Sequence, residues 1–585
     1  MCLAHLQLDS YGISKSTIRN WGKLNTVADG RLTSRANKRM SKKLVLPIEY
    51  FSNKNNTAFV QDMLDYVDEN CLAIMSVVFS LGIGLLKRAG IYERRHVAAV
   101  LAGYNGVRLI EELVEISLPT DEFDLLGLLY QSYLHEGKKN SIGSYYTPQR
   151  IVHAMTGTFD LSNGELFLDP CCGSGAFLLG VSADHPSQLY GVDNDKIAVL
   201  IAKINLLLKY RNVDFIPQIY CMDFLMTDSA TRHPVFEKRF DYIATNPPWG
   251  AMNTHLYDVK SISSKESFSY FFVKAHAQLK EHGTVRFLFP ESILNVRTHK
   301  DIRTFILDMG KLVGITIYGD LFSGVTTKYI DIECRKNAVK KDVSIYTAAQ
   351  VRIVDIQTVY ETKNLIFNLL SEDDLSIVRT VKNRGQFSLC SSIWALGIVT
   401  GDNKGKLFSN CAPGMEKIYT GKEIAPYILH PAKHYLRYDR EHLQQVAKEE
   451  IYRAPEKLAY KFISNKLVFA YDNSSSLFLN SANILIPEIP TMSIKAVMAF
   501  LNSSLFQFMY MKLFGEVKIL KGNLMELPFP KITDIENDRL TALVDNVLNG
   551  DDSKQDMIEN DIFALYDLTS EQIAYIRRTV RGKAD

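Results

Sequence analysis

The spacing of hydrophobic residues divides the chain into segments of different structural type. From Ala58 to about Leu134, apolar residues recur every three or four positions, which predicts a helical region. From about Gly143 to Arg335, short apolar runs alternate with helical stretches, which predicts a doubly wound α/β domain with a largely parallel sheet. After about residue 385 the pattern is mixed and rich in turns. The chain closes in helices, the last of them capped by Thr569.

Apolar runs in the α/β region predict strands. They read LFLD at 166–169, QLYGVD at 188–193, FDYIAT at 240–245, TVRFLFP at 284–290 and LVGITIY at 312–318. Helical patterns such as Asp195–Tyr210 and Phe268–Lys280 lie between them. The predicted architecture is a Rossmann-like sheet, preceded by a helical domain and followed by an α+β domain.

The most apolar run, Cys71–Leu86, is shorter than the roughly 20 residues that a membrane span needs. It also carries Ser76 and Ser80, so we expect a buried helix. The first twelve residues lack a basic segment followed by an apolar stretch, and no signal peptide is predicted. These features predict a soluble, cytoplasmic protein with no membrane partner.

Composition places the chain among ordinary globular proteins. Its 585 residues are 46% hydrophobic and 23% charged, with a formal net charge of +2, which excludes whole-chain disorder. At roughly 150 residues per domain, this length predicts about three to four domains. Eight cysteines are too few for a disulfide scaffold. Because none forms a CxxC pair, we expect reduced thiols and no metal site.

The first segment that carries chemistry reads LFLDPCCGSGAF at 166–177. An apolar strand ends in Asp169, and Gly173 and Gly175 let the chain turn tightly and let a ligand approach the backbone. About twenty residues further on, a second strand ends in Asp193, where nucleoside-binding domains carry a carboxylate for ribose hydroxyls. Position 178 is leucine, so GxGxxG is incomplete. This favours a smaller nucleoside such as S-adenosylmethionine over a dinucleotide.

Two further predicted strands end in polar and aromatic residues. After the third strand, the Asp223 carboxylate can bond an adenine amino group and the Phe224 ring can cover the base. The fourth strand ends in Asn246-Pro247-Pro248-Trp249, the most specific motif in the chain. Two prolines remove two backbone donors and fix the turn. The Asn246 side-chain oxygen and the Pro247 carbonyl can then accept both protons of one planar amino group, and Trp249 offers a ring face to the substrate base.

In this order and spacing, DPCCGSGAF, GVDND, CMDF and NPPW resemble the class I S-adenosylmethionine-dependent N6-adenine DNA methyltransferases. The order resembles the gamma, TaqI-type arrangement of restriction-modification and related defence systems. In that arrangement a cofactor motif precedes the glycine loop, and target recognition lies C-terminal to catalysis. GSYYTP at 143–148 matches the preceding motif. The resemblance covers the chain from about residue 141 to its end.

The resemblance implies a role for each matching residue. The implied cofactor-binding residues are Tyr146, Thr147, Pro148, Asp169, Cys171, Gly173, Gly175, Asp193, Asp223 and Phe224. The implied catalytic residues are Asn246, Pro247, Pro248 and Trp249, where the family usually has Tyr or Phe in the last position. Trp249 and Phe322 would contact a flipped-out adenine. The implied reaction is direct displacement at the sulfonium methyl, with no metal and no cysteine nucleophile.

The C-terminal part also resembles the target-recognition region of these enzymes. The matching phrases include GIVTGDNK at 397–404, KLVFAY at 466–471 and KGNLMELPFP at 521–530. A separate domain is needed because the catalytic sheet reads only one base. The expected partners are double-stranded DNA and a separate restriction endonuclease or defence-system subunits. The predicted domains are a basic N-terminal segment at 1–45, a helical domain at 46–140, the catalytic domain at 141–370 and the target-recognition domain at 371–585.

The N-terminal segment carries a cluster of positive charge. Residues 31–43 contain six Lys and Arg residues and no acid, which would give phosphate affinity without sequence information. Residues 11–23 resemble a turn followed by a recognition helix that Ser14 caps. A small DNA-contacting helix-turn-helix and a capped structural helix are equal alternatives here.

Other reactions need the same polarised amine. Alternatives are methylation of RNA adenine, of cytosine N4 in DNA, or of a protein glutamine amide, which the long C-terminal region disfavours. Asn at position 246 favours adenine by family pattern. A non-catalytic DNA-binding scaffold, or a defence-complex subunit active only with a partner, is a further alternative. The intact set of Asp193, Asp223 and Asn246 disfavours the scaffold. Residues 1–140 hold no convincing nuclease motif, so we expect modification without cleavage.

Overall fold

A computed structural model describes residues 51–134, 147–226, 233–250, 259, 261–319, 329–338, 342–347, 351–360, 364–367, 370–514 and 518–581. The described residues form two compact units, the first extending to Phe367 and the second beginning at Leu370. The N-terminal candidate helix-turn-helix, Tyr146 and Phe322 lie outside the described residues.

The first unit opens with the predicted helical region. Its helices are α4 (Thr57–Glu69), α5 (Ile74–Arg88), α6 (Arg95–Leu101), α7 (Glu111–Glu115) and α8 (Leu125–Tyr133). The apolar run expected at Cys71–Leu86 forms the buried α5, but the helix begins only at Ile74, because Cys71 has a left-handed φ of 49°. In the described part of the chain, no helix has both the length and the apolar character for crossing a membrane.

The described residues of the first unit form a nine-stranded sheet in the order β3-β2-β1-β4-β5-β7-β6-β8-β9. The strands are β1 (Phe167–Asp169), β2 (Leu189–Asp193), β3 (Gln218–Cys221), β4 (Phe240–Thr245), β5 (Leu279–Pro290), β6 (Leu312–Gly319), β7 (Tyr329–Arg335), β8 (Asp342–Tyr346) and β9 (Val351–Asp355). The five strands from β3 to β5 are parallel. β7 runs antiparallel to both β5 and β6, and β9 runs antiparallel to β8.

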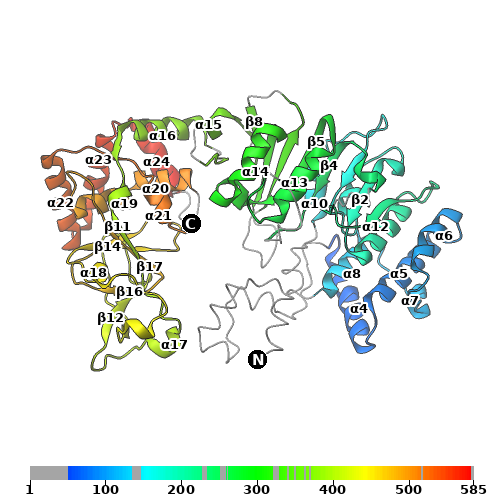
Figure 1. The fold of residues 1–585 in the computed structure, drawn as a ribbon, viewed down its shortest axis with the longest axis horizontal. Coiled ribbons are helices and arrows are strands. Elements are labelled where there is room, and N and C mark those ends of the chain that lie inside the picture. The colour runs from blue at the N-terminus through cyan, green and yellow to red at the C-terminus, as the bar shows by residue number, and fades with distance from the viewer. Residues whose placement is uncertain are drawn as a thin grey trace. The chain divides into compact units, whose positions relative to one another are not determined.

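Helices alternate along the chain with the strands of this sheet, in the cyan and green part of Figure 1. α11 (Ala176–Gly180) lies between β1 and β2, α12 (Lys196–Lys209) between β2 and β3, α13 (Ser267–Ala277) between β4 and β5, and α14 (Lys300–Phe305) between β5 and β6, whereas α10 (Gln149–Thr156) precedes β1 and α15 (Gln357–Tyr360) follows β9. Right-handed crossovers on the two sides of β1 place their helices on opposite faces of the sheet. The predicted doubly wound α/β fold is therefore confirmed, and strand order reverses between β1 and β4, where such sheets bind ligands.

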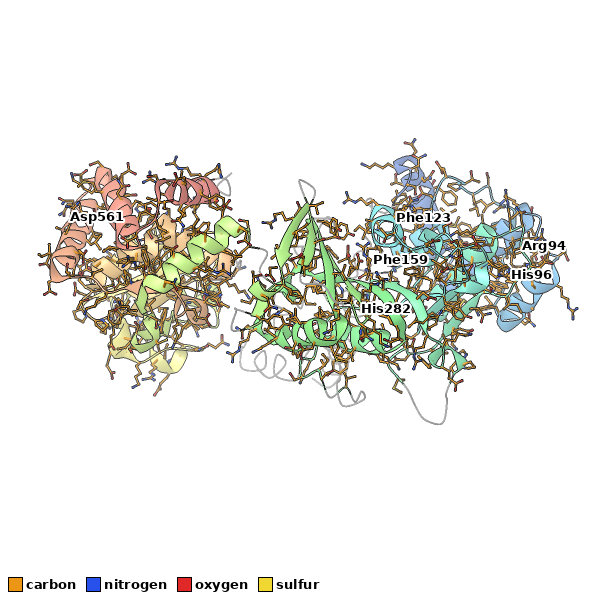
Figure 2. The ribbon with its side chains drawn as sticks, turned by 90° about the horizontal axis from the view of Figure 1, so that it is seen from above. Arg94, His96, Phe123, Phe159, His282 and Asp561 are labelled. Atoms are coloured by element: carbon orange, nitrogen blue, oxygen red, sulfur yellow. The ribbon has the colours of Figure 1, made fainter. Side chains whose placement is uncertain are left out.

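Side-chain contacts join α10, which is the helix directly before β1, and the residues after it to the strands. Phe159, labelled in Figure 2, stacks on Tyr242 of β4 with ring centroids 4.6 Å apart. Arg286 of β5 is buried, donates to the Asp331 carboxylate at 2.8 Å, and donates to the Ala154 carbonyl of α10 at 2.9 Å. These contacts fix the position of the segment that carries Thr147 and Pro148.

The second unit is an α+β structure, as predicted. Its helices are α16 (Glu372–Arg384), α17 (Asn403–Lys406), α18 (Glu449–Tyr452), α19 (Ile494–Asn502), α20 (Ser504–Leu513), α21 (Lys521–Leu524), α22 (Asp534–Leu548), α23 (Gln555–Leu565) and α24 (Ser570–Arg581). Its strands are β10 (Gly385–Phe387), β11 (Ile393–Leu396), β12 (Glu416–Tyr419), β13 (His434–Leu436), β14 (Lys457–Lys461), β15 (Phe469–Asp472), β16 (Leu477–Phe478), β17 (Ala482–Ile486) and β18 (Phe529–Pro530).

The strands of this unit form a four-stranded sheet, a three-stranded sheet and a two-stranded ribbon, and α19, α20, α22 and α23 contribute to its hydrophobic core. Thr569 caps the last helix as predicted, because its side-chain oxygen accepts the Gln572 backbone N–H at 3.2 Å.

Candidate active site

A cavity of about 210 Å³ lies at the carboxyl ends of β1, β2, β3 and β4. The predicted site residues that line it are Thr147, Cys171, Gly173, Asp193, Asp223, Phe224, Asn246 and Pro248. Pro148, Asp169, Gly175, Pro247 and Trp249 stand within two residues of these in the chain but are not part of the cavity wall. The structure thus brings four strand ends, far apart in sequence, to one concave site.

The loop after β1 needs glycine at two positions. Gly173 has φ of 51° and Gly175 has φ of 94°, both in the left-handed region that side chains disfavour. A Cβ on Gly175 would lie 3.3 Å from the Ala202 Cβ of α12, whereas a Cβ on Gly173 would meet nothing within 4 Å. The loop can therefore pack closely on α12 and leave open space in front of Gly173, on the cavity side.

Asp193 is the last residue of β2, and its carboxylate accepts hydrogen bonds from two backbone segments, the loop after β1 and the turn after β2. Its carboxylate accepts the Gly173 N–H at 2.8 Å and the Asp195 N–H at 2.9 Å. Burial raises the pKa of this carboxyl above its ordinary value, and the two N–H donors oppose the shift. Two acceptor oxygens with unused lone pairs remain beside the cavity.

Asp169, at the end of β1, is completely buried. Its Oδ1 accepts the Thr245 hydroxyl at 2.6 Å and the Cys171 N–H at 3.1 Å. Its Oδ2 finds no hydrogen-bond partner among the described residues. Burial raises the pKa of the Asp169 carboxyl to about 7. A buried acceptor of this kind requires a partner that arrives with a ligand or water.

The two adjacent thiols beside this carboxylate are poor nucleophiles. Burial holds the pKa of Cys171 and of Cys172 well above the usual value, and nearby Asp193 and Asp169 add to the shift. Both thiols are therefore protonated at neutral pH, whereas a reactive cysteine needs its thiolate.

Asp223 and Phe224 follow β3 on the far side of the cavity. The Asp223 carboxylate accepts the Leu225 N–H at 2.9 Å, which orients it. Phe224 is 2% exposed and stacks on Phe271 of α13 with ring centroids 5.9 Å apart and planes 12° apart. A polar acceptor and an aromatic wall therefore stand next to each other, which suits a nucleobase.

The Asn-Pro-Pro-Trp turn leaves β4 directly at the cavity. Asn246 and Pro248 line the cavity, and the Ser267 hydroxyl of α13 donates to the Pro248 carbonyl. The Trp249 ring packs against Tyr329 of β7, with centroids 4.8 Å apart and planes tilted by 38°. The Trp249 contact with a target base stays a prediction, as does that of Phe322.

Sequence reasoning missed the contribution of helix α8. Tyr130 and Gln131 of this helix line the cavity, although they precede the glycine loop by about forty residues. The apolar spacing of α8 predicts only a buried helix. The sequence offers one local signal for this helix. Asp124 stands directly before the apolar run LLGLLY, where a helix N-cap residue stands.

Comparisons with known proteins agree with this geometry. The N-6 DNA methylase family matches residues 121–393, and the TaqI-like C-terminal specificity domain matches residues 416–529. The chain is 30% identical over 332 residues to the type II methyltransferase M.VspI of Vibrio sp., covering 54% of this chain and 79% of that protein. It is 29% identical over 157 residues to the MjaVII type I methylase subunit of Methanocaldococcus jannaschii, covering 25% of this chain and 26% of that subunit.

Among solved structures, the type IIL restriction-modification enzyme MmeI in complex with DNA is similar in fold. The TM-score is 0.57 at 13% identity, covering 97% of this chain and 99% of that one. This likeness concerns the fold, whereas the relationship to M.VspI extends over most of that protein at 30% identity. The chain belongs to the N-6 adenine DNA methyltransferases of restriction-modification systems, whose methyl donor is S-adenosylmethionine.

Proposed function

We propose that this enzyme methylates the N6 amino group of one adenine within a specific duplex DNA sequence. The observation that carries the proposal is the position of Asn246 and Pro248, which line the same cavity as Asp193 and Asp223. An amine acceptor motif and a nucleoside site must share one cavity if a methyl group is to pass between them.

The residues around the cavity fit S-adenosylmethionine. Asp193 would accept the ribose hydroxyls, Asp223 would accept the adenine amino group, and Phe224 would cover the ring. Asp169 does not line the cavity, but its chain neighbour Pro170 does, and its unpartnered Oδ2 would accept the ammonium group of the methionine moiety, a donor that such an oxygen requires. When bound, S-adenosylmethionine supplies an electrophilic methyl group on a sulfonium.

The protein's part in the reaction is to position and polarise the target amine. The Asn246 side-chain oxygen and the Pro247 carbonyl would accept its two hydrogens, which draws the nitrogen towards a nucleophilic geometry. The nitrogen would then attack the methyl carbon in line as the sulfur–methyl bond breaks, which leaves S-adenosylhomocysteine, and the extra proton on the nitrogen would pass to solvent. The protonated thiols of Cys171 and Cys172 take no part.

The target adenine would leave the duplex to reach Asn246. A base inside the double helix cannot enter a concave site at the end of a sheet, so we propose that it flips out. Trp249 and Phe322 would contact the flipped base. Reading of the surrounding sequence falls to the second unit, where Lys404, Lys518 and Lys521 are exposed. By contrast, the Lys406 ammonium is already hydrogen-bonded within the protein, because it donates to the Thr400 carbonyl at 2.9 Å and to the His442 carbonyl.

We further propose that the chain modifies DNA without cutting it. A separate restriction endonuclease or defence-system subunit would supply cleavage, since relatives are named type I methylase subunits and type II methyltransferases. Incubation of the purified protein with plasmid DNA, Mg²⁺ and S-adenosylmethionine should leave the plasmid supercoiled. Linear or nicked product would show a nuclease within this chain.

The test of the proposed reaction is transfer of a tritiated methyl group to defined nucleic acids. Duplex DNA should accept the label, single-stranded RNA should not, and Asn246→Ala should lose transfer while binding S-adenosylmethionine as the wild type does. Digestion of labelled DNA should release N6-methyladenine. Release of N4-methylcytosine, or preferential labelling of RNA, would assign the enzyme to one of the alternative substrates instead.

A further inference from the structure

Helix α8 contacts the glycine loop through the residue that caps it. Asp124 accepts the Gly127 N–H at 2.9 Å with Oδ1, which starts the helix. Its Oδ2 accepts the hydroxyl of Ser174, which stands between Gly173 and Gly175. The Asp124 side chain therefore joins the helical region to the middle of the loop after β1.

A third residue, Asn205 of α12, donates hydrogen bonds to both Asp124 and Ser174. The Asn205 side-chain amide donates to Asp124 Oδ1 at 2.8 Å and to the Ser174 carbonyl at 3.0 Å. Asp124, Ser174 and Asn205 are 7%, 2% and 8% exposed. Buried polar groups lose much stability when a partner is removed, so this three-residue cluster holds the loop in one conformation.

The other end of α8 contacts the second loop of the cavity. The Tyr130 hydroxyl donates to Asp195 Oδ2 at 2.5 Å, and the Asp195 N–H donates to Asp193 Oδ1 at 2.9 Å. Burial and the Asp195 carboxylate raise the pKa of Tyr130, so its hydroxyl stays protonated and donates. Tyr130 thus orients the backbone that holds the proposed ribose-binding carboxylate.

We propose that helix α8 is an integral wall of the cofactor site, and that Asp124 and Tyr130 are positioning residues for S-adenosylmethionine. This inference rests on the proposed function of the cavity. The two residues act on different loops, after β1 and after β2, and both loops must be ordered before the cofactor can bind. A helix that fixes them beforehand lowers the ordering cost of binding.

The sharpest test removes one oxygen atom. Tyr130→Phe keeps the ring and deletes the donor to Asp195, while Tyr133→Phe, on the same helix, is the matched control. Tyr133 does not line the cavity, and its hydroxyl bonds none of the described residues. By isothermal titration with S-adenosylmethionine, Tyr130→Phe should raise Kd roughly three- to tenfold. Tyr133→Phe should match the wild type.

Methyl-transfer kinetics separate positioning from catalysis. Tyr130→Phe should raise the KM for S-adenosylmethionine by about the same factor as Kd, with kcat at saturation unchanged. Ser174→Ala, which breaks the contact at the other end of the helix, should act in the same direction. Simple loss of folding would instead lower kcat and the melting temperature while leaving Kd of the folded fraction unchanged.

Hydrogen exchange gives a readout that does not depend on methyl transfer. S-adenosylmethionine should slow amide exchange in peptides covering 125–133 of the wild type, and this protection should weaken in Tyr130→Phe. If the wild type binds the cofactor but Tyr130→Phe and Ser174→Ala bind it equally well, and α8 gains no protection, the inference is wrong. If the wild type does not bind S-adenosylmethionine at all, the proposed function fails first.

Discussion

The Gly173 N–H donates to Oδ2 of Asp193 at 2.8 Å, so the loop after β1 is joined to the acid that ends β2. The same carboxylate accepts the Asp195 N–H through Oδ1. One side chain therefore orders two neighbouring loops and presents its remaining lone pairs to the cavity.

We predict that Asp193→Ala weakens binding of S-adenosylmethionine on the order of 10- to 100-fold. The change removes both the expected ribose acceptor and the partner of two backbone donors, and hydrogen bonds to charged groups are among the stronger ones. Isothermal titration measures the effect. Asp160→Ala, at an exposed aspartate away from the cavity, serves as control. Equal Kd values for wild type and Asp193→Ala would show that Asp193 does not contribute to cofactor binding.

Cofactor affinity should depend on pH through Asp169. Because burial raises the pKa of this carboxyl to about 7, the charged form increases as pH rises from 5.5 to 7.0. A cationic ligand favours the carboxylate, so Kd for S-adenosylmethionine should fall roughly tenfold over that interval. The interval lies below the range in which an α-amino group titrates.

The isosteric variant Asp169→Asn isolates this effect. It keeps an acceptor for Thr245 and Cys171 but carries no titratable charge, so its Kd should be higher at pH 7.0 and nearly independent of pH. The pH dependence of folding stability has the opposite sign to that of cofactor affinity. A folded-state pKa above the unfolded one favours the folded protein at low pH, and this contribution is lost as pH rises through about 7. A wild-type Kd that stays constant from pH 5.5 to 7.0 would contradict the assigned role.

Gly175→Ala should reduce both stability and cofactor affinity. An alanine at φ of 94° costs about 1–2 kcal/mol, and its Cβ would lie 3.3 Å from Ala202 Cβ. Gly164→Ala is the matched control, because Gly164 has φ of 84° and open space where a Cβ would go. Thermal unfolding should detect both variants, whereas titration with S-adenosylmethionine should detect only Gly175→Ala. A similar loss of affinity in the control would mean that general destabilisation is the cause.

Much of the fold follows from the sequence because buried parallel strands carry continuous apolar runs. β2 and β4 correspond to LYGVD and FDYIAT, and each ends at the residue before a polar turn. The motifs predicted at four strand ends also lie around one cavity in the structure. By contrast, β9 has Val351 and Ile353 exposed, 61% and 72%, so its pattern did not distinguish a strand from a loop.

The contacts that the sequence does not reveal are those between distant residues. Asp124 and Ser174 are 50 positions apart, and Tyr130 and Asp195 are 65 positions apart. Each looks ordinary in its own segment: Asp124 resembles a helix cap, and Tyr130 resembles a core residue. Likewise, no local pattern predicts that Trp249 packs against Tyr329. Such pairings depend on how the helical region docks on the sheet, which no local pattern records.

The most direct test of the central claim is modified-base sequencing of genomic DNA from cells that express the wild-type protein, beside cells that express Asn246→Ala. We predict N6-methyladenine at one sequence context in the first sample and its absence in the second. The purified variant should bind S-adenosylmethionine with wild-type affinity. Methyladenine that persists with Asn246→Ala, or DNA without the modification although the wild type binds the cofactor, would contradict the account.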